Sequence, residues 1–154
     1  MTLKIGIVDT TFARVDMARY AIEELRNNEP SVMIERITVP GFKNTPWAAK
    51  QLINKGVDAV MVFGWIGPSL TDKITYAVAS MGLIMLQIEY DRPIIDVTVH
   101  EDEAHDEKEL FDIAVDRSRK HARGGLILML KGELTRWAGM GLRQGRPDAG
   151  PIIK

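Results

Sequence analysis

The sequence predicts an α/β fold in which helices cover both faces of a four-stranded parallel sheet. Strand-like and helix-like patterns alternate along the 154 residues, and repeated βα units produce a parallel sheet. The strand-like runs are short and rich in apolar residues, as expected of strands buried on both faces. Together with the right-handed crossover rule, these patterns predict a three-layer α/β/α, flavodoxin-like arrangement.

Residues that interrupt regular structure bound each element. The first strand is expected to end at Asp9 and the first helix at Asn28. Pro40 ends the second strand because it has no N–H to give to a ladder. Gly56 ends the second helix and Gly64 the third strand. The strands are predicted at residues 3–8, 32–39, 59–63 and 94–99, and the helices at residues 16–27, 48–55, 70–90, 103–121 and 126–140.

The composition predicts one ordinary globular domain spanning residues 1–154. Hydrophobic residues make up 45% of the chain and charged residues 27%, which is enough apolar material for a full core. A net charge of −1 gives no support for a nucleic-acid surface, and no apolar run is long enough to span a membrane. The chain has no cysteine and no signal-peptide pattern, so we expect a cytoplasmic protein.

The loop at residues 39–49, Val-Pro-Gly-Phe-Lys-Asn-Thr-Pro-Trp-Ala-Ala, is the most informative segment. Pro40 ends a strand, Gly41 permits close backbone approach, and Pro46 suits the first turn of a helix. Such a stiff loop at the carboxyl end of a strand lies where α/β folds hold ligands. Taken alone, however, it is better explained as a structural connection.

Four strand-end loops, at residues 9–14, 40–45, 64–71 and 100–103, are expected to meet at one edge of the sheet. They mix aromatic with polar side chains, which suits a flat heteroaromatic ligand with polar edges. The residues concerned are Phe12, Phe42, Trp47 and Trp65, with Thr10, Thr11, Arg14, Lys43 and Asn44. Each aromatic side chain taken singly is more often packed beneath its own loop.

Two familiar functions of this fold are not favoured. A phosphate-binding flavodoxin needs a Ser/Thr/Gly-rich nest after the first strand, and residues 9–14 contain no glycine. A phosphoacceptor domain needs a carboxylate after the third strand, where this chain has Phe63, Gly64 and Trp65.

Residues 100–107, His-Glu-Asp-Glu-Ala-His-Asp-Glu, admit two interpretations. Clustered histidines and carboxylates can bind divalent ions, but acidic residues at a helix start more often cap free N–H groups. We expect capping. By residue type His100, at a strand end, is the best general acid–base candidate, whereas His121 is expected on the surface.

Several blocks of sequence together resemble archaeal-type riboflavin synthases of the lumazine synthase-like superfamily. They are Gly-Ile-Val-Asp-Thr-Thr-Phe-Ala-Arg-Val-Asp-Met-Ala at residues 6–18, Thr-Val-Pro-Gly at 38–41 with Pro46, Val-His-Glu-Asp-Glu-Ala at 99–104, Thr-Arg at 135–136, Ala-Gly at 138–139, Gly-Leu-Arg-Gln-Gly at 141–145, and Asp-Ala-Gly-Pro at 148–151. The resemblance covers nearly the whole chain. Its first and last blocks are the specific ones, because the Val-Pro-Gly loop is shared with lumazine synthases.

This resemblance implies a lumazine synthase-like fold and a transferase reaction. Two molecules of 6,7-dimethyl-8-ribityllumazine dismutate by transfer of a four-carbon unit, which gives riboflavin and 5-amino-6-(D-ribitylamino)uracil. It also implies homopentamers with active sites between subunits and, in some members, a need for a divalent cation such as Mg²⁺. No organic cofactor is expected.

The resemblance also implies roles for particular residues. Phe12 would stack on one ring, and Lys43 or Arg14 could stabilise the anion left when the C7 methyl group loses a proton. His100 is the candidate for proton transfer. The implied substrate-binding residues are Thr11, Phe12, Pro40, Gly41, Phe42, Gly64, Trp65, Ile66, Arg143 and Gln144.

One departure and one segment qualify the resemblance. Lumazine synthases carry a catalytic histidine early in the helix after the third strand, and residues 70–76 contain none. This argues against lumazine synthase activity, although that activity and a non-catalytic flavin- or lumazine-binding role both remain alternatives. The Gly/Pro-rich tail at residues 139–154 is expected to order against a neighbouring subunit and help close its site.

Overall fold

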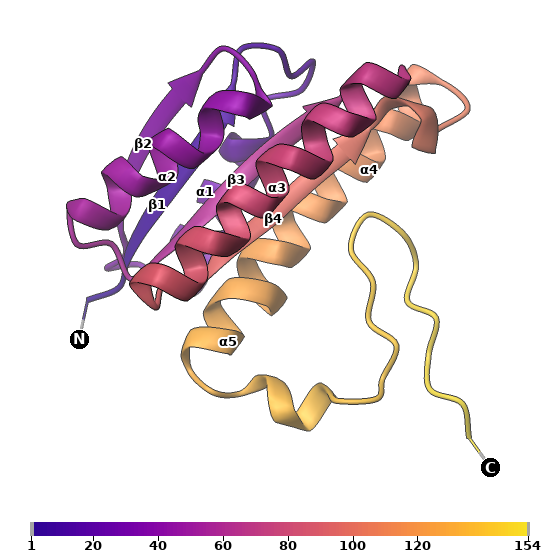
Figure 1. The fold of residues 1–154 in the computed structure, drawn as a ribbon. Helices are drawn as coiled ribbons and strands as arrows, with labels where there is room; N and C mark the ends of the chain where they lie inside the picture. The colour runs from indigo at the N-terminus through magenta and orange to yellow at the C-terminus, as the bar shows by residue number, and fades with distance from the viewer. Residues whose placement is uncertain (1, 154) are drawn as a thin grey trace.

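The computed structural model describes residues 2–153, which form three layers around a parallel sheet (Figure 1). The strands lie in the order β2-β1-β3-β4 and every neighbouring pair is parallel. They are β1 (Lys4–Thr10), β2 (Met33–Val39), β3 (Ala59–Ile66) and β4 (Ile94–His100). The helices are α1 (Met17–Asn28), α2 (Thr45–Asn54), α3 (Leu70–Tyr90), α4 (Glu107–Lys120) and the short α5 (Leu128–Leu130). The predicted fold class is confirmed.

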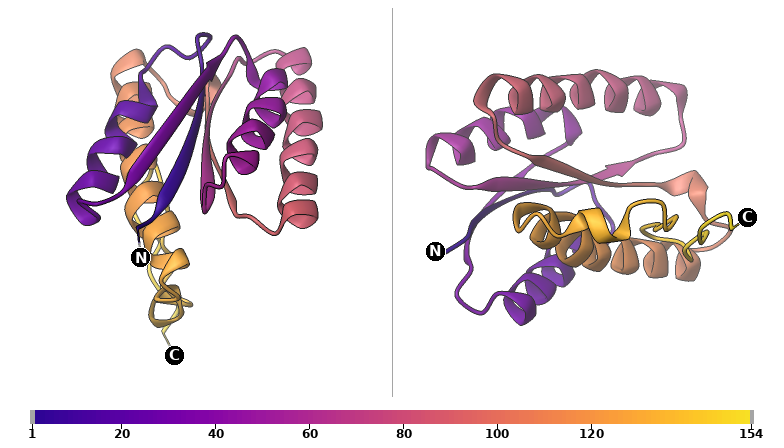
Figure 2. Two further views of the ribbon diagram at one scale, coloured as in Figure 1. Left: turned by 90° about the vertical axis from the view of Figure 1, so that its left-hand side faces the viewer. Right: turned by 90° about the horizontal axis from the view of Figure 1, so that it is seen from below.

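Helices cover both faces of the sheet, as the two views of Figure 2 show. α2 and α3 pack side by side on one face, and α1 and α4 pack on the other. Side chains alternate between the two faces along each strand, so the core divides into two clusters. Phe63 and Trp65 pack toward α1 and α4, whereas Val60 and Val62 pack toward α2. Both clusters reach the carboxyl edge of the sheet and give its loops a rigid base.

Three strands are longer at their carboxyl ends than predicted, and β4 is one of them because it runs one residue further, to His100. β1 continues to Thr10, and β3 runs through Gly64 to Ile66 instead of ending at Phe63. Gly64 does not end β3. Its lack of a Cβ leaves room for the ring of Phe42, because an added Cβ would lie 2.6 Å from Cε1 of that ring. The glycine therefore serves close approach rather than a turn.

The predictions for the last helices are wrong in their bounds. The helix predicted at residues 103–121 begins later, because residues 101–103 form a separate 3₁₀ turn and Asp106 caps α4 by accepting a hydrogen bond from the N–H of Glu109 at 2.7 Å. The helix predicted at residues 126–140 does not exist as such. The chain continues from α4 through a π-helical turn over His121–Ile127 to α5, and a 3₁₀ turn follows at Leu134–Trp137.

Within residues 2–153, no helix is both long enough and apolar enough to cross a bilayer.

Gly6 of β1 provides a test of the packing between the sheet and α2. A Cβ at Gly6 would lie 2.9 Å from Cδ1 and 3.1 Å from Cβ of Leu52. We expect Gly6→Ala to lower the free energy of unfolding by about 1–3 kcal/mol, because overpacking forces neighbouring side chains from their preferred rotamers. Urea denaturation followed by circular dichroism measures this change.

Gly124→Ala is the matched control. Gly124 lies in the helical segment His121–Ile127, and nothing lies within 4 Å of an added Cβ. The free energy of unfolding of the Gly124→Ala variant should stay the same or rise by up to about 1 kcal/mol. Equal unfolding midpoints for the two variants would contradict the close contact between Gly6 and Leu52.

Candidate functional site

The carboxyl edge of the sheet splits between β1 and β3. β1 remains paired with β2 through Thr10, and β3 remains paired with β4 through Ile66. In contrast, β1 and β3 pair with each other only as far as Val8 and Val62. β1 leads to α1 on one face and β3 leads to α3 on the other. This is the switch point of the fold, where open α/β sheets bind ligands in a crevice.

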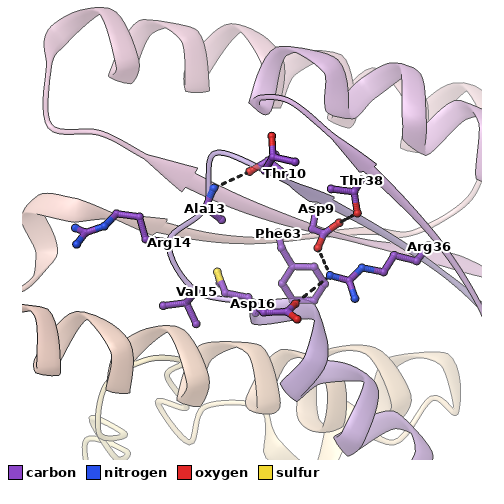
Figure 3. Close-up of a pocket in the computed structure, with 11 residues that line it drawn as sticks. Asp9, Thr10, Ala13, Arg14, Val15, Asp16, Arg36, Thr38 and Phe63 are labelled. Atoms are coloured by element: carbon purple, nitrogen blue, oxygen red, sulfur yellow. Dashed lines mark hydrogen bonds and ion pairs between the residues drawn. The ribbon is translucent and has the colours of Figure 1, made fainter.

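One ionic network holds both ends of the loop between β1 and α1 (Figure 3). Asp9, near the end of β1, accepts a hydrogen bond from Oγ1 of Thr38 at 2.6 Å and pairs with Arg36 of β2. The same guanidinium lies 2.9 Å from Oδ1 of Asp16, the residue that caps α1. The hydrogen bond to Asp9 is the main cause that raises the pKa of Arg36. These residues border a cavity of about 240 Å³, and the network fixes the loop relative to the sheet.

Phe12 lies on this anchored loop with its side chain 54% exposed. Thr11, directly before it, donates its N–H to the carbonyl of Val39 at 2.9 Å and its hydroxyl to the carbonyl of Pro40 at 3.4 Å. An exposed ring on a loop tied to the neighbouring strand end fits the stacking role predicted for Phe12. Thr11 and Pro40 are brought to the same edge, as the sequence predicted.

The two cations predicted to stabilise an anion have different surroundings. Arg14 forms ion pairs with Glu107 and, at 3.9 Å, with Glu101, so its guanidinium is already engaged. Figure 3 shows Arg14 directed away from the Asp9 network. The hydrogen bond to Glu107 is also the main cause that raises the pKa of Arg14. Lys43, in the 3₁₀ turn Phe42–Asn44, is exposed, and no carboxylate of residues 2–153 lies within ion-pair distance of it.

Several predicted site residues are buried under the edge rather than open to it. Trp65 and Ile66 are only 2% and 3% exposed, because they belong to β3 and not to the loop that the sequence predicted. The indole N–H of Trp65 donates to Oε1 of Glu101 at 2.9 Å. Phe42 is buried against Tyr76, with 5.2 Å between the ring centroids. Phe42 and Trp65 are thus packed beneath the edge of the sheet, as was expected for each aromatic side chain taken singly.

The remaining residues of the predicted 39–49 loop divide between the surface and the core, where Val39, Thr45, Ala48 and Ala49 are buried. Pro40 is exposed, Gly41 is half-buried with nothing within 4 Å of an added Cβ, and Trp47 is 60% exposed. Pro46 stands in the first turn of α2, as predicted. The backbone of residues 40 and 41 is therefore accessible beside Phe12.

His100, at the end of β4, is half-buried in a cluster of charged residues. Nζ of Lys73 lies 2.9 Å from its Nδ1 and 2.8 Å from Oδ1 of Asp102. An ammonium group can only donate, so Nδ1 accepts and the neutral ring carries its proton on Nε2. Burial is the main cause that lowers the pKa of His100, and the charge of Lys73 lowers it further. The edge of the ring packs on Tyr76, with the centroids 5.0 Å apart.

The reasoning from sequence missed Lys73. It lies in the first turn of α3, the segment in which a histidine was sought and not found. Its contact with His100 joins residues 27 positions apart, and no local pattern reports such a contact. The sequence did offer one indication of Lys73, which is a lone lysine early in the helix that follows the third strand.

The acidic residues after β4 cap N–H groups at helix starts and form ion pairs, which confirms the capping interpretation. Glu103 accepts a hydrogen bond from the backbone N–H of His100 at 2.8 Å and pairs with Arg117 at 2.8 Å. Burial would raise the pKa of Glu103, but the hydrogen bonds from Arg117 and the His100 N–H outweigh it and the pKa falls. Asp102 pairs with Lys73, and Asp106 caps α4.

The structure does not support a metal site in this segment. Among residues 2–153, no three or more His, Cys, Asp or Glu side chains are grouped so that they could hold an ion. The carboxylates of residues 101–107, which the sequence offered as possible metal ligands, already bond to cations or to N–H groups of the protein. Within residues 2–153 of one subunit, the side chains of this segment are thus engaged with protein groups and offer no free ligand set to a divalent cation.

His121 is half-buried, which corrects the prediction of a surface position. Its Nδ1 lies 2.9 Å from the carbonyl oxygen of Arg117, and burial is the main cause that lowers its pKa. The reason is that the helix does not end near this residue but continues through the π-helical turn, which turns His121 toward the protein.

The tail lies along α4 of its own subunit for a few residues (Figure 1). The carbonyl of Gln144 accepts a hydrogen bond from Nε of Arg117 at 3.2 Å, and the N–H of Gly145 donates to Asp116 at 2.9 Å. Arg143 is exposed, and its N–H bonds to Asp148 at 2.9 Å within the tail. The predicted contact with a neighbouring subunit stays a prediction.

Lys73 should control the protonation of His100. We expect the pKa of His100 to lie below the ordinary histidine value of about 6.5, and Lys73→Met to raise it, because the substitution removes a cation from Nδ1. The folded state favours the neutral ring of His100. The stability that this ring contributes is therefore fully present above the pKa of His100 in the unfolded chain, and it is lost as the pH falls through the lower pKa of His100 in the folded protein. Histidine ring resonances followed by NMR across a pH titration measure the shift.

The control is Lys108→Met, which removes an 86% exposed lysine from α4. It should leave the His100 titration where it is in the parent. A His100 pKa that moved as much in this variant as in Lys73→Met would show that the contact is not responsible.

Comparison with known proteins agrees with this geometry. Residues 2–129 match the family described as 6,7-dimethyl-8-ribityllumazine synthase. The riboflavin synthase of Aeropyrum pernix is 52% identical over 150 residues, which cover 96% of this chain and 97% of that protein. The riboflavin synthase of Archaeoglobus fulgidus is 49% identical over 154 residues, which cover 99% and 100%. That of Methanothermobacter thermautotrophicus is 47% identical over 152 residues, which cover 97% and 99%. The chain therefore belongs to the 6,7-dimethyl-8-ribityllumazine synthase family, and within it to the archaeal-type riboflavin synthases.

Proposed function

We propose that this protein is a riboflavin synthase. It converts two molecules of 6,7-dimethyl-8-ribityllumazine into riboflavin and 5-amino-6-(D-ribitylamino)uracil by transfer of a four-carbon unit. One observation carries this proposal: relatives that bear the name share about half of their residues with this chain over nearly their whole lengths. Their similarity includes the tail, which lies beyond the part matched by the lumazine synthase family as a whole.

The crevice between β1 and β3 is the place we propose for the reacting rings. Phe12 would stack on one ring, because it is exposed on a loop whose two ends are fixed. The backbone of Pro40 and Gly41 would hold the ribityl chain and the pyrimidine edge. Phe42 and residues 64–66, which the resemblance gives the same role, are buried in the single chain. Fixing two reactants in one orientation can contribute about 7–11 kcal/mol to lowering a barrier, so placement alone could supply much of the rate.

Lys43 is the better of the two candidates for stabilising the anion formed when the C7 methyl group loses its proton. Its ammonium group is exposed beside the crevice and has no carboxylate partner among residues 2–153. Arg14 is already paired with Glu107. An exposed lysine without a carboxylate partner is free to turn toward a developing anion, whereas Arg14 would first have to leave Glu107.

His100 is the group we propose for proton transfer. Its lowered pKa keeps the ring neutral near pH 7, and Lys73 fixes the tautomer with the proton on Nε2. In this form the ring offers an N–H to an oxygen or nitrogen atom on which negative charge develops. In this arrangement His100 therefore acts first as a hydrogen-bond donor, and it can accept a proton at Nδ1 only after the ammonium group of Lys73 moves away.

The lumazine synthase alternative is not favoured. The first turn of α3 presents Lys73 where that activity calls for a histidine. A non-catalytic lumazine- or flavin-binding role would need only the aromatic edge, and turnover separates it from the proposed reaction.

We propose a cytoplasmic enzyme that needs no organic cofactor. The lumazine is both donor and acceptor of the four-carbon unit, so the reaction balances without an external oxidant or reductant. A need for magnesium is carried over from the resemblance, and the described residues of one subunit gather no ligand set for it. Assays with and without magnesium test this point.

We also propose a homopentamer with active sites at subunit boundaries. The outer face of α3 carries apolar side chains at alternating spacings of four and three residues, which is the pattern of a helix seam that packs against another surface. These residues are Ile74, Val78, Met81, Met85 and Ile88, each 55–78% exposed in the single chain. A stripe of this kind supports assembly, and native mass spectrometry measures the number of subunits.

The proposed reaction gives a direct test of His100. The parent protein should form riboflavin from 6,7-dimethyl-8-ribityllumazine faster than the uncatalysed reaction, as measured by fluorescence. His100→Asn should lower kcat by about 10²–10⁴-fold, the usual contribution of a positioned acid or base.

His105→Asn is the control, because His105 is exposed in the same segment and uses only its backbone N–H, which bonds to Glu109 at 3.0 Å. It should retain parent activity. A parent protein that binds the lumazine without turnover would support the binding-protein alternative, and unchanged kcat in His100→Asn would remove His100 from the mechanism.

A shortened chain tests the tail. We expect deletion of residues 142–154 to reduce turnover by about tenfold or more, because loss of positioning groups is costly in rate. The fold should survive, since the two core clusters include no residue beyond Leu130. Circular dichroism checks the fold while the fluorescence assay measures turnover. Full activity in the shortened chain would show that the tail has no part in the site.

A further inference from the structure

Arg117 of α4 lies where three distant parts of the chain meet. One nitrogen of its guanidinium donates to the carbonyl of Thr98 in β4 at 2.9 Å. Two nitrogens form a fork on the carboxylate of Glu103, at 2.8 and 2.9 Å. Its Nε donates to the carbonyl of Gln144 in the tail at 3.2 Å. The side chain is only 12% exposed, so these contacts are held away from bulk water.

Glu103 connects this guanidinium to His100. The carboxylate oxygen that Arg117 contacts at 2.8 Å also accepts the backbone N–H of His100 at 2.8 Å. The negative charge of Glu103 favours the protonated imidazole of His100, and the Arg117 fork offsets that charge. The charged and titratable groups around His100 are Lys73 and Tyr76 from α3, Asp96 from β4, and Asp102 and Glu103 from the 3₁₀ turn. Two cations lie behind Glu103: Arg117 of α4 and, at 3.9 Å, Arg146 of the tail.

The tail docks against this same group. Gly145 is buried, and its φ of +83° is a left-handed conformation that suits glycine. An added Cβ at Gly145 would lie 2.6 Å from Nε of Arg117. Arg146 donates to the carbonyl of Glu103 at 3.0 Å, and Lys120 donates to the carbonyl of Arg146 at 3.4 Å. Residues 144–146 thus cover Arg117 and reach the turn that follows His100.

We propose that docking of residues 144–146 on α4 positions His100 and sets its charge environment, with Arg117 and Glu103 as the link. Arg117 and Gly145 are positioning residues, because neither touches the reacting atoms. The effect on turnover rests on the proposed function, whereas the effect on His100 itself does not.

The physical consequence has a definite sign. Removing the docked residues admits water to the Arg117–Glu103 fork and weakens it, since a hydrated ion pair is worth less than a shielded one. Less of the Glu103 charge is then offset. The protonated form of His100 gains stability, which raises the pKa of His100.

The decisive experiment compares the full chain with a chain ending at Gly141. NMR titration of the histidine rings, without substrate, measures the pKa of His100 in each. We expect a rise of about 0.5 unit in the shortened chain, the size that follows from losing one partly shielded ion pair. An unchanged His100 pKa in the shortened chain would overturn the proposal.

Two full-length variants locate the effect at Arg117. Gly145→Ala places a Cβ against the guanidinium and should raise the His100 pKa as the shortened chain does. Gly139→Ala is its match, because Gly139 has a φ of +81° but nothing within 4 Å of an added Cβ. It carries the same backbone strain and should leave the titration unchanged. Equal shifts in both variants would contradict a specific contact at Arg117.

Substitution of Arg117 separates positioning from stability. Arg117→Lys keeps the charge but loses the fork, so it should raise the His100 pKa less than Arg117→Met. Turnover in the same variants should show a fall in kcat with little change in KM and a pH profile displaced with the His100 pKa. If His100→Asn retains full turnover, the proposed catalytic role fails while the NMR titrations still decide whether the tail acts on His100.

Discussion

The parting of β1 and β3 beyond Val8 and Val62 is the constraint on which the rest of the site depends. Each strand keeps its outer partner to the edge of the sheet, so the sheet opens only along this line. The connections then leave toward opposite faces, and every loop that can touch a ligand is placed around one opening. An apolar layer beneath it, with Phe63 on one face and Val62 on the other, prevents the opening from reaching deeper.

Charged groups, rather than apolar ones, place the loops around this opening. Arg36 joins two ends of one loop, and Arg117 joins a strand, a turn and the tail. Partly exposed ion pairs add little to overall stability, but a guanidinium fork fixes direction as well as distance. The core therefore supplies stability, and the arginines supply the geometry of the site.

Much of the fold could be predicted from the sequence, because hydrophobic periodicity and strand-ending residues act locally. The four strands and the helices α1 to α4 follow from such patterns, as does the first-turn position of Pro46. What could not be predicted depends on contacts between distant elements. Gly64 continues a strand because Phe42 arrives from another loop.

The chemistry of the site was harder to predict for the same reason. His100 could be selected by residue type and position, but its tautomer depends on Lys73, which lies on a helix 27 residues away. His121 was misplaced because the helix continues through a π-helical turn, which nothing in the local Gly-Gly pattern indicates. Family resemblance identified the loop residues, and only the three-dimensional arrangement separated engaged Arg14 from exposed Lys43.

The left-handed glycines of the tail have a consequence for how tightly it can be held. Gly139, Gly141, Gly145 and Gly150 all adopt positive φ, and an unfolded glycine samples more conformations than any other residue. Ordering each residue costs about 1–2 kcal/mol of conformational entropy, and only a handful of hydrogen bonds offset that cost here. The position of the tail thus depends on these few contacts, and losing one of them should release the segment more readily than it would unfold the sheet and its helices.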